Sequence, residues 1–463
     1  MSFPKYPEYK DSGVDWLGEV PAHWSVRRIR YVADINPSKS EARSLAGNKK
    51  VSFIPMESVG EDGTLDLKHV RPLEEVIDGY TYVRDGDVTF AKITPCFENG
   101  KAALMEGLES GIGFATTELT VLRPKPKCST GEFLFRVVHS GPFRLLGEAR
   151  MYGAGGQKRV PDDFARDFTI AWPPLTEQAT IAAFLDYETA RIDALVEEQQ
   201  RLIELLKEKR QAVISHAVTK GLDPDVPMKD SGVEWLGEVP AHWELTRIGW
   251  ITSELTYGFT NPMPTEDDGP KMLTANDIGW GEIFYDTARS TSEFAFKKLL
   301  TDKSRPRRGD LLLTKDGTLG RVAVHDGRPA CINQSVALIR TACVADPDYL
   351  CALLQASCYQ SQMIFEAGGT TIKHIYITRF AKMPVALPPL HEQGKILEKM
   401  KSEDAIYLSL IAEAEKSAKL LGERRSALIS AAVTGKIDVR DWRPPDNAAA
   451  APAKALLAQE AQS

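Results

Sequence analysis

KDSGVDWLGEVPAHW at residues 10–24 returns as KDSGVEWLGEVPAHW at residues 229–243, and of these fifteen positions only Asp15 and Glu234 differ. PPLTEQ at 173–178 likewise returns as PPLHEQ at 388–393. The segments that end these repeats also match, since LLKEKRQAVISHAVTKGLD at 205–223 and LLGERRSALISAAVTGKID at 420–438 share 11 of 19 residues. A repeat of this length indicates a duplicated pair of domains and not a solenoid of short repeats.

Two variable regions of nearly equal length lie between the repeated motifs, with 148 residues in the first and 144 in the second. Their sequences scarcely resemble each other. One echo remains, RDGDVTFAK at 84–92 and RRGDLLLTK at 307–315. Both regions mix β-branched runs with short helical stretches, which is typical of α/β structure. We therefore predict one shared fold that carries two different surfaces.

Each PPL motif predicts the start of a long helix, because proline disfavours helix before it and a glutamate follows in the first turn. Glycine closes each helix, at Gly221 and Gly435. A heptad pattern of apolar residues runs between these limits, formed by Leu185, Ile192, Leu195, Leu202, Leu206 and Val213 and again by Met400, Tyr407, Ala414, Leu421 and Leu428. A lone helix with such a stripe is unstable in water, so we predict that the two helices pair. The alternative is that each folds separately onto its own domain.

The predicted fold class is α/β, with two α/β domains in a pseudo-twofold arrangement, separated by an antiparallel coiled coil of two long helices. The predicted boundaries are 1–172 for the first domain, 173–221 for the first helix, 222–387 for the second domain, 388–437 for the second helix and 438–463 for a disordered tail. The tail is expected to be disordered because it ends in a low-complexity, alanine-rich stretch.

Composition and charge exclude several classes of protein. The net charge of −7 argues against a protein that coats nucleic acid without preference. No stretch approaches the roughly 18 apolar residues of a membrane helix, and the start lacks a signal-peptide core, so we expect a cytoplasmic protein with no membrane partner. The six cysteines show no zinc-site spacing, so we expect reduced thiols and no bound metal.

Known catalytic motifs are missing from the sequence. There is no GxxxxGK[ST] phosphate loop, and no HExxH, GxSxG or Cys–His constellation. WPPL at 172–175 and LPPL at 387–390 imitate poorly the Asn-Pro-Pro-Tyr type of motif of DNA methyltransferases, and both lead straight into predicted helices. We therefore predict a chain without catalysis or a cofactor of its own.

Glycine-rich loops with polar and basic side chains are the candidate binding sites. Lys and Arg neutralise phosphates, and Arg, Gln, Asn and Thr read base edges, so these loops point to DNA. For any single residue a solvated surface charge is the simpler interpretation, but the loops fall at matching places in the two halves. The predicted DNA-binding residues are Lys92, Thr94, Asn99, Lys101, Gln157, Lys158, Arg159, Arg305, Arg307, Arg308, Lys315, Thr318, Arg321, Thr370, Thr371, Lys373 and His374.

The repeated motif carries four tryptophans, Trp16, Trp24, Trp235 and Trp243. A tryptophan pair with leucine and valine between its members is typical of a domain core. Near identity of the two copies indicates that both meet the same constraint. That constraint is either internal packing or one partner protein bound twice.

The repeated motifs resemble those of one known family, the specificity subunits of type I restriction-modification systems. The resemblance rests on DSGVxWLGEVPAHW, PPLxEQ, the helix end LLxExRxALISxAVTGKID and the duplicated order, and it covers roughly residues 5–440. It implies that each variable region is a target recognition domain that reads one half of an asymmetric bipartite site in double-stranded DNA, with the helices as a spacer. It also implies two methyltransferase subunits and two motor and nuclease subunits as partners, with S-adenosylmethionine, ATP and Mg bound there.

Two other classes of protein stay open at this point. An assembly scaffold that never touches DNA would explain the repeated tryptophans but not the divergence of the variable regions. A fused or degenerate methyltransferase would transfer methyl groups without partners. The resemblance names no base-contacting residues, so the predicted DNA-binding residues rest on their chemistry alone.

Overall fold

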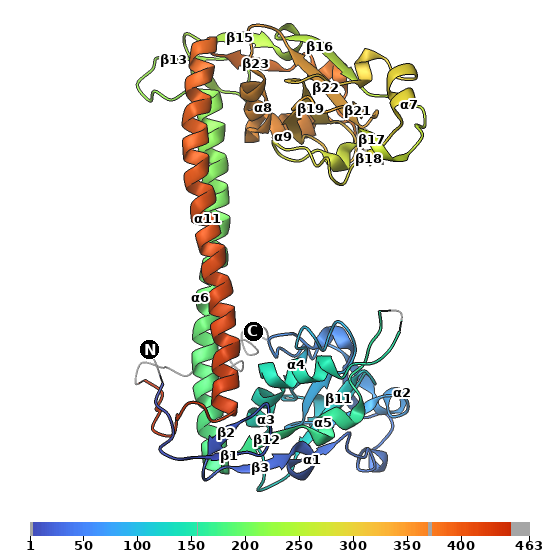
Figure 1. Ribbon diagram of the computed structural model, residues 1–463, viewed down its shortest axis with the longest axis vertical. Helices are drawn as coiled ribbons and strands as arrows, with labels where there is room; N and C mark the ends of the chain where they lie inside the picture. Colours follow the sequence, from blue (N-terminus) through green and yellow to red (C-terminus); the bar gives the residue numbers. More distant parts are fainter. Residues whose placement is uncertain (1–2, 155, 369–372, 446–463) are drawn as a thin grey trace. The chain divides into compact units, whose positions relative to one another are not determined.

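The computed structural model describes residues 3–154, 156–368 and 373–445. The chain folds into two compact units. Unit 1 comprises the described residues of 1–199 and 416–463, and unit 2 comprises those of 200–415. Figure 1 shows that strands and short helices accompany the long helices α6 (Leu175–Lys220) and α11 (Leu390–Val433) in both units. The mixed helix-and-sheet class predicted from the sequence is confirmed.

Unit 1 contains short strands and short helices in addition to its parts of α6 and α11. Its strands are β1 (Tyr9–Asp11), β2 (Glu19–Pro21), β3 (Ser25–Arg28), β4 (Ala33–Ile35), β5 (Lys50–Ile54), β6 (Val70–Pro72), β7 (Thr81–Arg84), β8 (Val88–Ala91), β9 (Ala102–Leu104), β10 (Ile112–Ala115), β11 (Leu119–Pro124) and β12 (Thr169–Trp172). Its short helices are α1 (Ile29–Val32), α2 (Leu73–Val76), α3 (Gly131–Val138), α4 (Gly141–Ala149), α5 (Asp162–Asp167) and the 3-10 turns η1 (Ala42–Ser44), η2 (Met56–Ser58) and η3 (Glu109–Gly111).

Unit 2 has the same kinds of element. Its strands are β13 (Met228–Asp230), β14 (Glu238–Pro240), β15 (Glu244–Arg247), β16 (Thr252–Tyr257), β17 (Glu266–Leu273), β18 (Arg289–Ser290), β19 (Leu311–Thr314), β20 (Val322–Val324), β21 (Ala330–Ile332), β22 (Val336–Thr341) and β23 (Pro384–Leu387). Its short helices are α7 (Glu293–Lys298), α8 (Pro347–Gln355), α9 (Ser357–Glu366), α10 (Ile377–Phe380) and the 3-10 turns η4 (Ile248–Trp250), η5 (Ala275–Asp277) and η6 (Asp302–Ser304).

The sheets of the two units follow one topology. The central sheet of unit 1 has the order β4-β11-β8-β9, and that of unit 2 has the order β16-β22-β19-β20, with all neighbours antiparallel. A second sheet in each contains one parallel pair, β5 with β10 and β17 with β21. The order β6-β5-β10-β7 of unit 1 corresponds to β18-β17-β21 of unit 2, where no described strand takes the place of β7. The two variable regions therefore share a fold despite their different sequences.

The echo between RDGDVTFAK and RRGDLLLTK marks the same turn and strand in both units. Gly86 and Gly309 have φ values of +88° and +89° in tight turns before β8 and β19, a backbone conformation that favours glycine. Asp87, 1% exposed, then accepts two hydrogen bonds of 2.8 Å from Arg123 on β11. In unit 2, Asp310 accepts bonds of 2.8 and 2.6 Å from Arg340 on β22.

In unit 2, α6 and α11 run antiparallel. Arg210 forms an ion pair with Asp404 at 2.5 Å, whereas the earlier Ile203 packs in one cluster with the later Ile411 and Ala414. Later residues of α6 thus contact earlier residues of α11, as antiparallel helices require. Both long helices are mostly polar on average, and among the described residues no helix is long and apolar enough to cross a membrane.

The predicted apolar positions lie correctly on α11, and on α6 Leu185 and Ile192 are buried and Leu206 is partly buried, as predicted. Ala414 and Leu428 are buried, as predicted. Leu195 and Leu202 are 46% and 43% exposed, and Ile203 is buried in place of Leu202. Val196, partly buried, takes the place of Leu195 in the same way. These two positions of the heptad were assigned one residue early because an apolar residue follows each of them. In unit 1 the pairing of the helices includes an ion pair of 2.8 Å between Arg425 and Asp193.

The repeated motifs bind each other at the start of the long helix in unit 1. Glu177, in the first turn of α6, accepts hydrogen bonds from the Tyr6 hydroxyl at 2.5 Å and from Trp24 Nε1 at 3.0 Å. His23 Nε2 lies 2.8 Å from the second carboxylate oxygen. Trp24 is fully buried and Tyr6 is 4% exposed, so two buried donors depend on one carboxylate.

Unit 2 repeats this arrangement with one partner fewer. Glu392 in α11 accepts from Trp243 Nε1 at 3.0 Å, and its other oxygen lies 2.7 Å from His242 Nε2. The glutamine after each glutamate joins the long helix to an earlier, short helix of the same unit. Gln178 Oε1 accepts from the backbone of Thr130 at the start of α3, and Gln393 Oε1 accepts from Asp346 at the start of α8. Near identity of the motifs thus has an internal cause.

Residues 438–442, which the sequence assigned to the tail, pack on unit 1. The Asp438 amide donates to the Pro4 carbonyl at 2.8 Å. Val439 is 3% exposed, and the Trp442 ring meets Phe184 edge-on with 5.7 Å between ring centroids. The remainder of the predicted tail from residue 446 lies outside the described residues.

Candidate nucleic-acid interface

The structure brings two of the predicted loops together in each unit. In unit 1 the segment after β8 lies beside the hairpin that ends at Arg159, since the Thr94 amide donates to Lys158 and the Val160 amide donates to Lys92, at 2.9 and 2.8 Å. In unit 2 the segment after β19 lies beside the hairpin that ends at His374 in the same way. The loops that glycines with polar and basic side chains indicated in the sequence thus lie side by side in each unit.

Arg159 ends the hairpin of unit 1 and is held by a carboxylate. Its Nε lies 3.2 and 3.0 Å from the two oxygens of Glu118, and its Nη2 lies 2.8 Å from one of them. This hydrogen bonding lowers the pKa of Glu118, so the carboxylate stays ionised. Lys92 has an acidic neighbour too, with 3.7 Å between its Nζ and Asp162.

The other predicted residues of unit 1 differ in their surroundings. Thr94 donates its hydroxyl to the Lys158 carbonyl at 3.2 Å, and Asn99 donates to Glu61 at 2.8 Å. Lys101 Nζ lies 3.4 Å from the Met56 carbonyl. The side chains of Gln157 and Lys158 are exposed, and Lys158 forms no ion pair within the described part of the chain.

In unit 2 one carboxylate joins both loops. Asp316 accepts from Lys315 Nζ at 2.8 Å, and its other oxygen lies 2.5 Å from His374 Nδ1. The Lys315 ammonium also lies over the Tyr257 ring, 5.3 Å from its centroid. Lys373 is exposed beside His374. Thr370 and Thr371 lie outside the described residues.

The turn between β19 and β20 presents the remaining residues of this loop. The Thr314 hydroxyl donates to the Thr318 carbonyl and accepts from the Arg321 amide, which closes the turn and leaves the Thr318 side chain exposed. Arg321 and Lys101 stand at equivalent places, because each carbonyl accepts from the last residue of the preceding strand. The two predicted basic residues therefore correspond between the units.

The predicted arginines before β19 do not join these loops. Arg307 and Arg308 precede the strand and Lys315 follows it, so they lie at opposite ends of β19. Arg305 pairs with Asp302 at 2.7 Å and lies over the Phe296 ring, while Arg307 comes within 3.9 Å of Asp302. These arginines occupy a separate place on unit 2.

The four tryptophans pack inside their own units. Trp24 and Trp243 are buried, with the bonds to Glu177 and Glu392 described above. The Trp16 ring lies 5.2 Å from that of Phe168, and the Trp235 ring lies 5.0 Å from that of Tyr359. Internal packing, one of the two interpretations left open by the sequence, accounts for their contacts.

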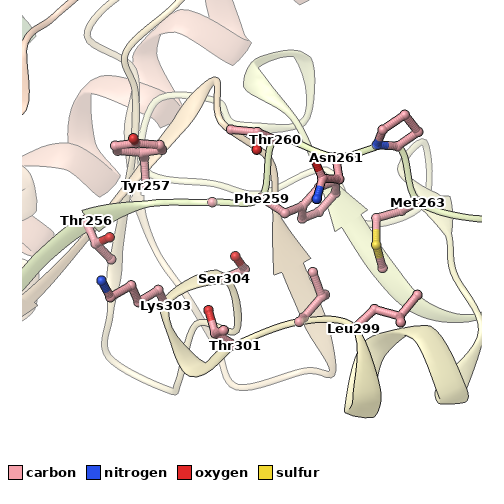
Figure 2. Close-up of a pocket in the computed structure, with 13 residues that line it drawn as sticks. Thr256, Tyr257, Phe259, Thr260, Asn261, Met263, Leu299, Thr301, Lys303 and Ser304 are labelled. Carbon is pink, nitrogen blue, oxygen red and sulfur yellow. The ribbon is translucent and has the colours of Figure 1, made fainter.

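A hollow in unit 2 was missed by sequence reasoning. It measures about 550 Å³ and lies between the segment that follows β16 and the segment around η6 (Figure 2). Its lining is mainly polar, with Tyr257, Asn261 and Lys303 among the side chains drawn there. Tyr257 also touches Lys315, so the hollow adjoins the loop pair. The sequence signal beside the hollow is the glycine in TYGFTN. Gly258 lies so close to the Ile332 carbonyl that a side chain has no room there.

The acidic and sulfur-containing side chains of the interface do not form a metal site. Within residues 3–154, 156–368 and 373–445, no group of three or more His, Cys, Asp or Glu residues could hold a metal ion. The cysteines described in the structure are all free thiols. What the loop pairs offer chemically is hydrogen bonding and charge.

Comparison with known proteins links these features to one group. Residues 272–419 match the family described as type I restriction modification DNA specificity domain. The chain is 26% identical to the type I restriction enzyme EcoEI specificity subunit of Escherichia coli, over 82% of this chain and 77% of that subunit. It is 38% identical to the EcoAI specificity subunit of Escherichia coli over 40% of this chain and 31% of that subunit.

Solved structures agree on the fold. A chain from a structure of a type I R-M system superposes with a TM-score of 0.66 at 18% identity, covering 89% of this chain and 98% of that chain. The HsdS subunit from Thermoanaerobacter tengcongensis superposes with a TM-score of 0.53 at 17% identity, covering 90% and 98%.

Proposed function

Because the chain belongs to the family of specificity subunits of type I restriction-modification systems, we propose that it selects the DNA sequence on which such a system acts. Each variable region reads one half of an asymmetric, interrupted site in double-stranded DNA, and the long helices serve as the spacer. The chain has no catalysis of its own. Adenine methylation and cleavage belong to partner subunits, which bind S-adenosylmethionine, ATP and Mg.

One observation carries this proposal: the two units share the same central sheet and its Asp–Arg pair but present different side chains in the loops. The pairs Asp87–Arg123 and Asp310–Arg340 occupy equivalent places, since each joins the turn before one central strand to the neighbouring strand. At the end of the hairpin, by contrast, unit 1 has Arg159 and unit 2 has His374. A shared frame with different exposed donors is what two half-sites of different sequence require, since base edges are distinguished by their donors and acceptors.

The basic side chains of the loop pairs divide into two kinds. Arg159, Lys315 and His374 are held by carboxylates, which makes them suited to directed hydrogen bonds. Lys158 and Lys373 are exposed and project from the same hairpins, which makes them suited to phosphates. This division also agrees with the acidic net charge, because few free cations are needed to position DNA.

Exposed aliphatic side chains on the long helices support protein partners. In unit 2, Leu202, Leu205, Ile406 and Leu410 are 43% to 56% exposed. In unit 1, Leu195 and Leu420 are exposed as well. Exposed apolar side chains on these helices offer contact area to partner proteins. We assign these helix faces to the two methyltransferase subunits, and we place the two motor and nuclease subunits on the assembled complex.

A pure assembly scaffold is less well supported. Its argument was the repeated tryptophan motif, and those tryptophans make internal contacts with Glu177, Glu392, Phe168 and Tyr359. The repetition therefore needs no second copy of a partner protein. A scaffold would also leave the different hairpin ends of the two units without a role.

The test uses the full chain in complex with its methyltransferase subunits and a randomised DNA library. Lys158→Ala and Lys373→Ala should weaken binding to all sequences and reduce the slope of log affinity against log salt by about one each. Lys419→Ala, on the exposed surface of α11, is the matched control and should change neither. Binding that stays unchanged in both hairpin variants would remove these loops from the DNA surface.

A further inference from the structure

Arg159 is fixed in place before any ligand arrives. Its backbone pairs with Tyr152 through two hydrogen bonds of 2.8 and 3.1 Å, and the flanking Lys158 and Val160 bond to the segment after β8. Its side chain is fixed by Glu118, which takes the edge formed by Nε and Nη2. A donor that is held in this way loses little conformational freedom when it binds.

The free end of the Arg159 guanidinium is a two-pronged donor. Arginine has five N–H donors in a planar fork, and Glu118 engages only the Nε and Nη2 side. Nη1 and the outer hydrogen of Nη2 remain, and the side chain is 41% exposed. Two parallel donors at this spacing match the O6 and N7 acceptors of guanine in the major groove.

The carboxylate of Glu118 argues against phosphate as the ligand. It lies within 3.2 Å of the Arg159 guanidinium, so a phosphate bound there would approach a second anion. The edge of a guanine base is neutral and meets no such repulsion. The neighbouring Lys158, exposed and with no ion pair among the described residues, is the better phosphate ligand.

The geometry points to Arg159 as the residue that reads a guanine in one half-site, with Glu118 as its positioning residue. This inference rests on the proposed function and names the base that the first variable region selects. The equivalent residue of unit 2 is His374, whose Nδ1 is held by Asp316 and which keeps only Nε2 for a ligand. A histidine has no guanidinium fork, so the assignment of guanine applies to unit 1 alone.

The experiment measures base preference in the complex of the full chain with its methyltransferase subunits. Arg159→Ala should reduce discrimination for guanine at one position of one half-site by roughly 5- to 150-fold and leave all other positions unchanged. Glu118→Gln should reduce it at the same position by a smaller factor. If Glu118 had a merely structural role, its replacement would relax the whole half-site.

Lys158→Ala separates this inference from the proposed function. It should weaken all sequences alike, with the base preferences intact. Weaker binding in Lys158→Ala together with an unchanged guanine preference in Arg159→Ala would overturn the guanine assignment only. Unchanged binding in both variants would overturn the DNA interface itself.

Two further results would contradict the assignment. The first is a half-site without any guanine, and the second is an Arg159→Ala variant that weakens all sequences equally with a flatter salt dependence. Should Arg159→Ala fail to fold, Arg159→Gln keeps a donor for Glu118 but lacks the fork, and it is judged by the same loss of guanine preference.

Discussion

Replacing Glu177 by alanine removes the acceptor on which two buried donors of unit 1 depend. Trp24 Nε1 and the Tyr6 hydroxyl both bond to Glu177, and neither residue is more than 4% exposed. A buried donor left without a partner costs about 1–3 kcal/mol, so we expect a loss of about 2–6 kcal/mol in the stability of this region. His23 is 40% exposed and can turn to water, so it adds little.

Glu392→Ala is the internal comparison in unit 2. Only Trp243 is buried there, because His242 is 46% exposed and no tyrosine corresponds to Tyr6. One orphaned donor predicts a loss of about 1–3 kcal/mol. The difference between the two variants therefore measures the contribution of the Tyr6 bond.

Hydrogen exchange read by mass spectrometry is the suitable assay, because it gives the opening free energy of each segment separately. The peptides to follow cover residues 19–28 and 238–247. Glu177→Gln is the control, since its amide oxygen still accepts from Trp24 and Tyr6 and most of the protection should remain. A Glu177→Ala variant whose first peptide opens as rarely as in the parent chain would refute the reasoning.

Three further predictions concern pH, the buried ion pairs and the long helices. Burial, with nearby arginines, lowers the pKa of His139 to about 3, so below about pH 6.5 the unfolded chain binds a proton that the folded unit does not bind. Unit 1 should therefore lose up to about 5 kcal/mol of stability between pH 6.5 and 3. His139→Gln keeps a donor for the Gly100 carbonyl and should reduce this dependence of stability on pH, measured by urea unfolding. Equal slopes would show that His139 does not control it. Asp87→Ala leaves the buried Arg123 without its main partner and should lower the stability by about 3–5 kcal/mol in thermal or urea unfolding. Asp310→Ala should lower it less, because the Arg340 side chain is 22% exposed and that of Arg123 is 11% exposed. A larger loss in Asp310→Ala than in Asp87→Ala would contradict this account. A chain cut after Gly221 should form a homodimer, because Ile214, Ala217 and Val218 repeat the residues with which α11 fills the core of unit 1; a monomer in ultracentrifugation at micromolar concentration would rule this out.

The repeated motifs made the duplication and the long helices predictable, because identity between copies needs no knowledge of contacts. The partners of each motif were not predictable. Glu177 and Trp24 lie 153 residues apart, and nothing local in either motif reveals their bond. The heptad phase on α6 was wrong at Leu202 because the adjacent Ile203 is equally apolar. The candidate loops were predictable as well, because glycines and charged residues mark turns and exposed loops in the local sequence.

The chemistry of the candidate site was only partly visible in the sequence. Basic residues in glycine-rich loops indicated Lys158 and Arg159 equally, although one is exposed and the other is held by Glu118. Glu118 is 41 residues from its partner and carries no motif. Arg307 and Arg308 were grouped with Lys315 by closeness in sequence, but β19 separates them by its length.

The central claim is that this chain selects a bipartite site for adenine methylation. Methylome sequencing of cells with and without its gene tests that claim most directly. Loss of adenine methylation at one asymmetric motif, made of two specific half-sites separated by unspecified bases, is the predicted result. An unchanged methylome in cells whose partner methyltransferase is expressed, or the loss of a continuous motif, would contradict the account.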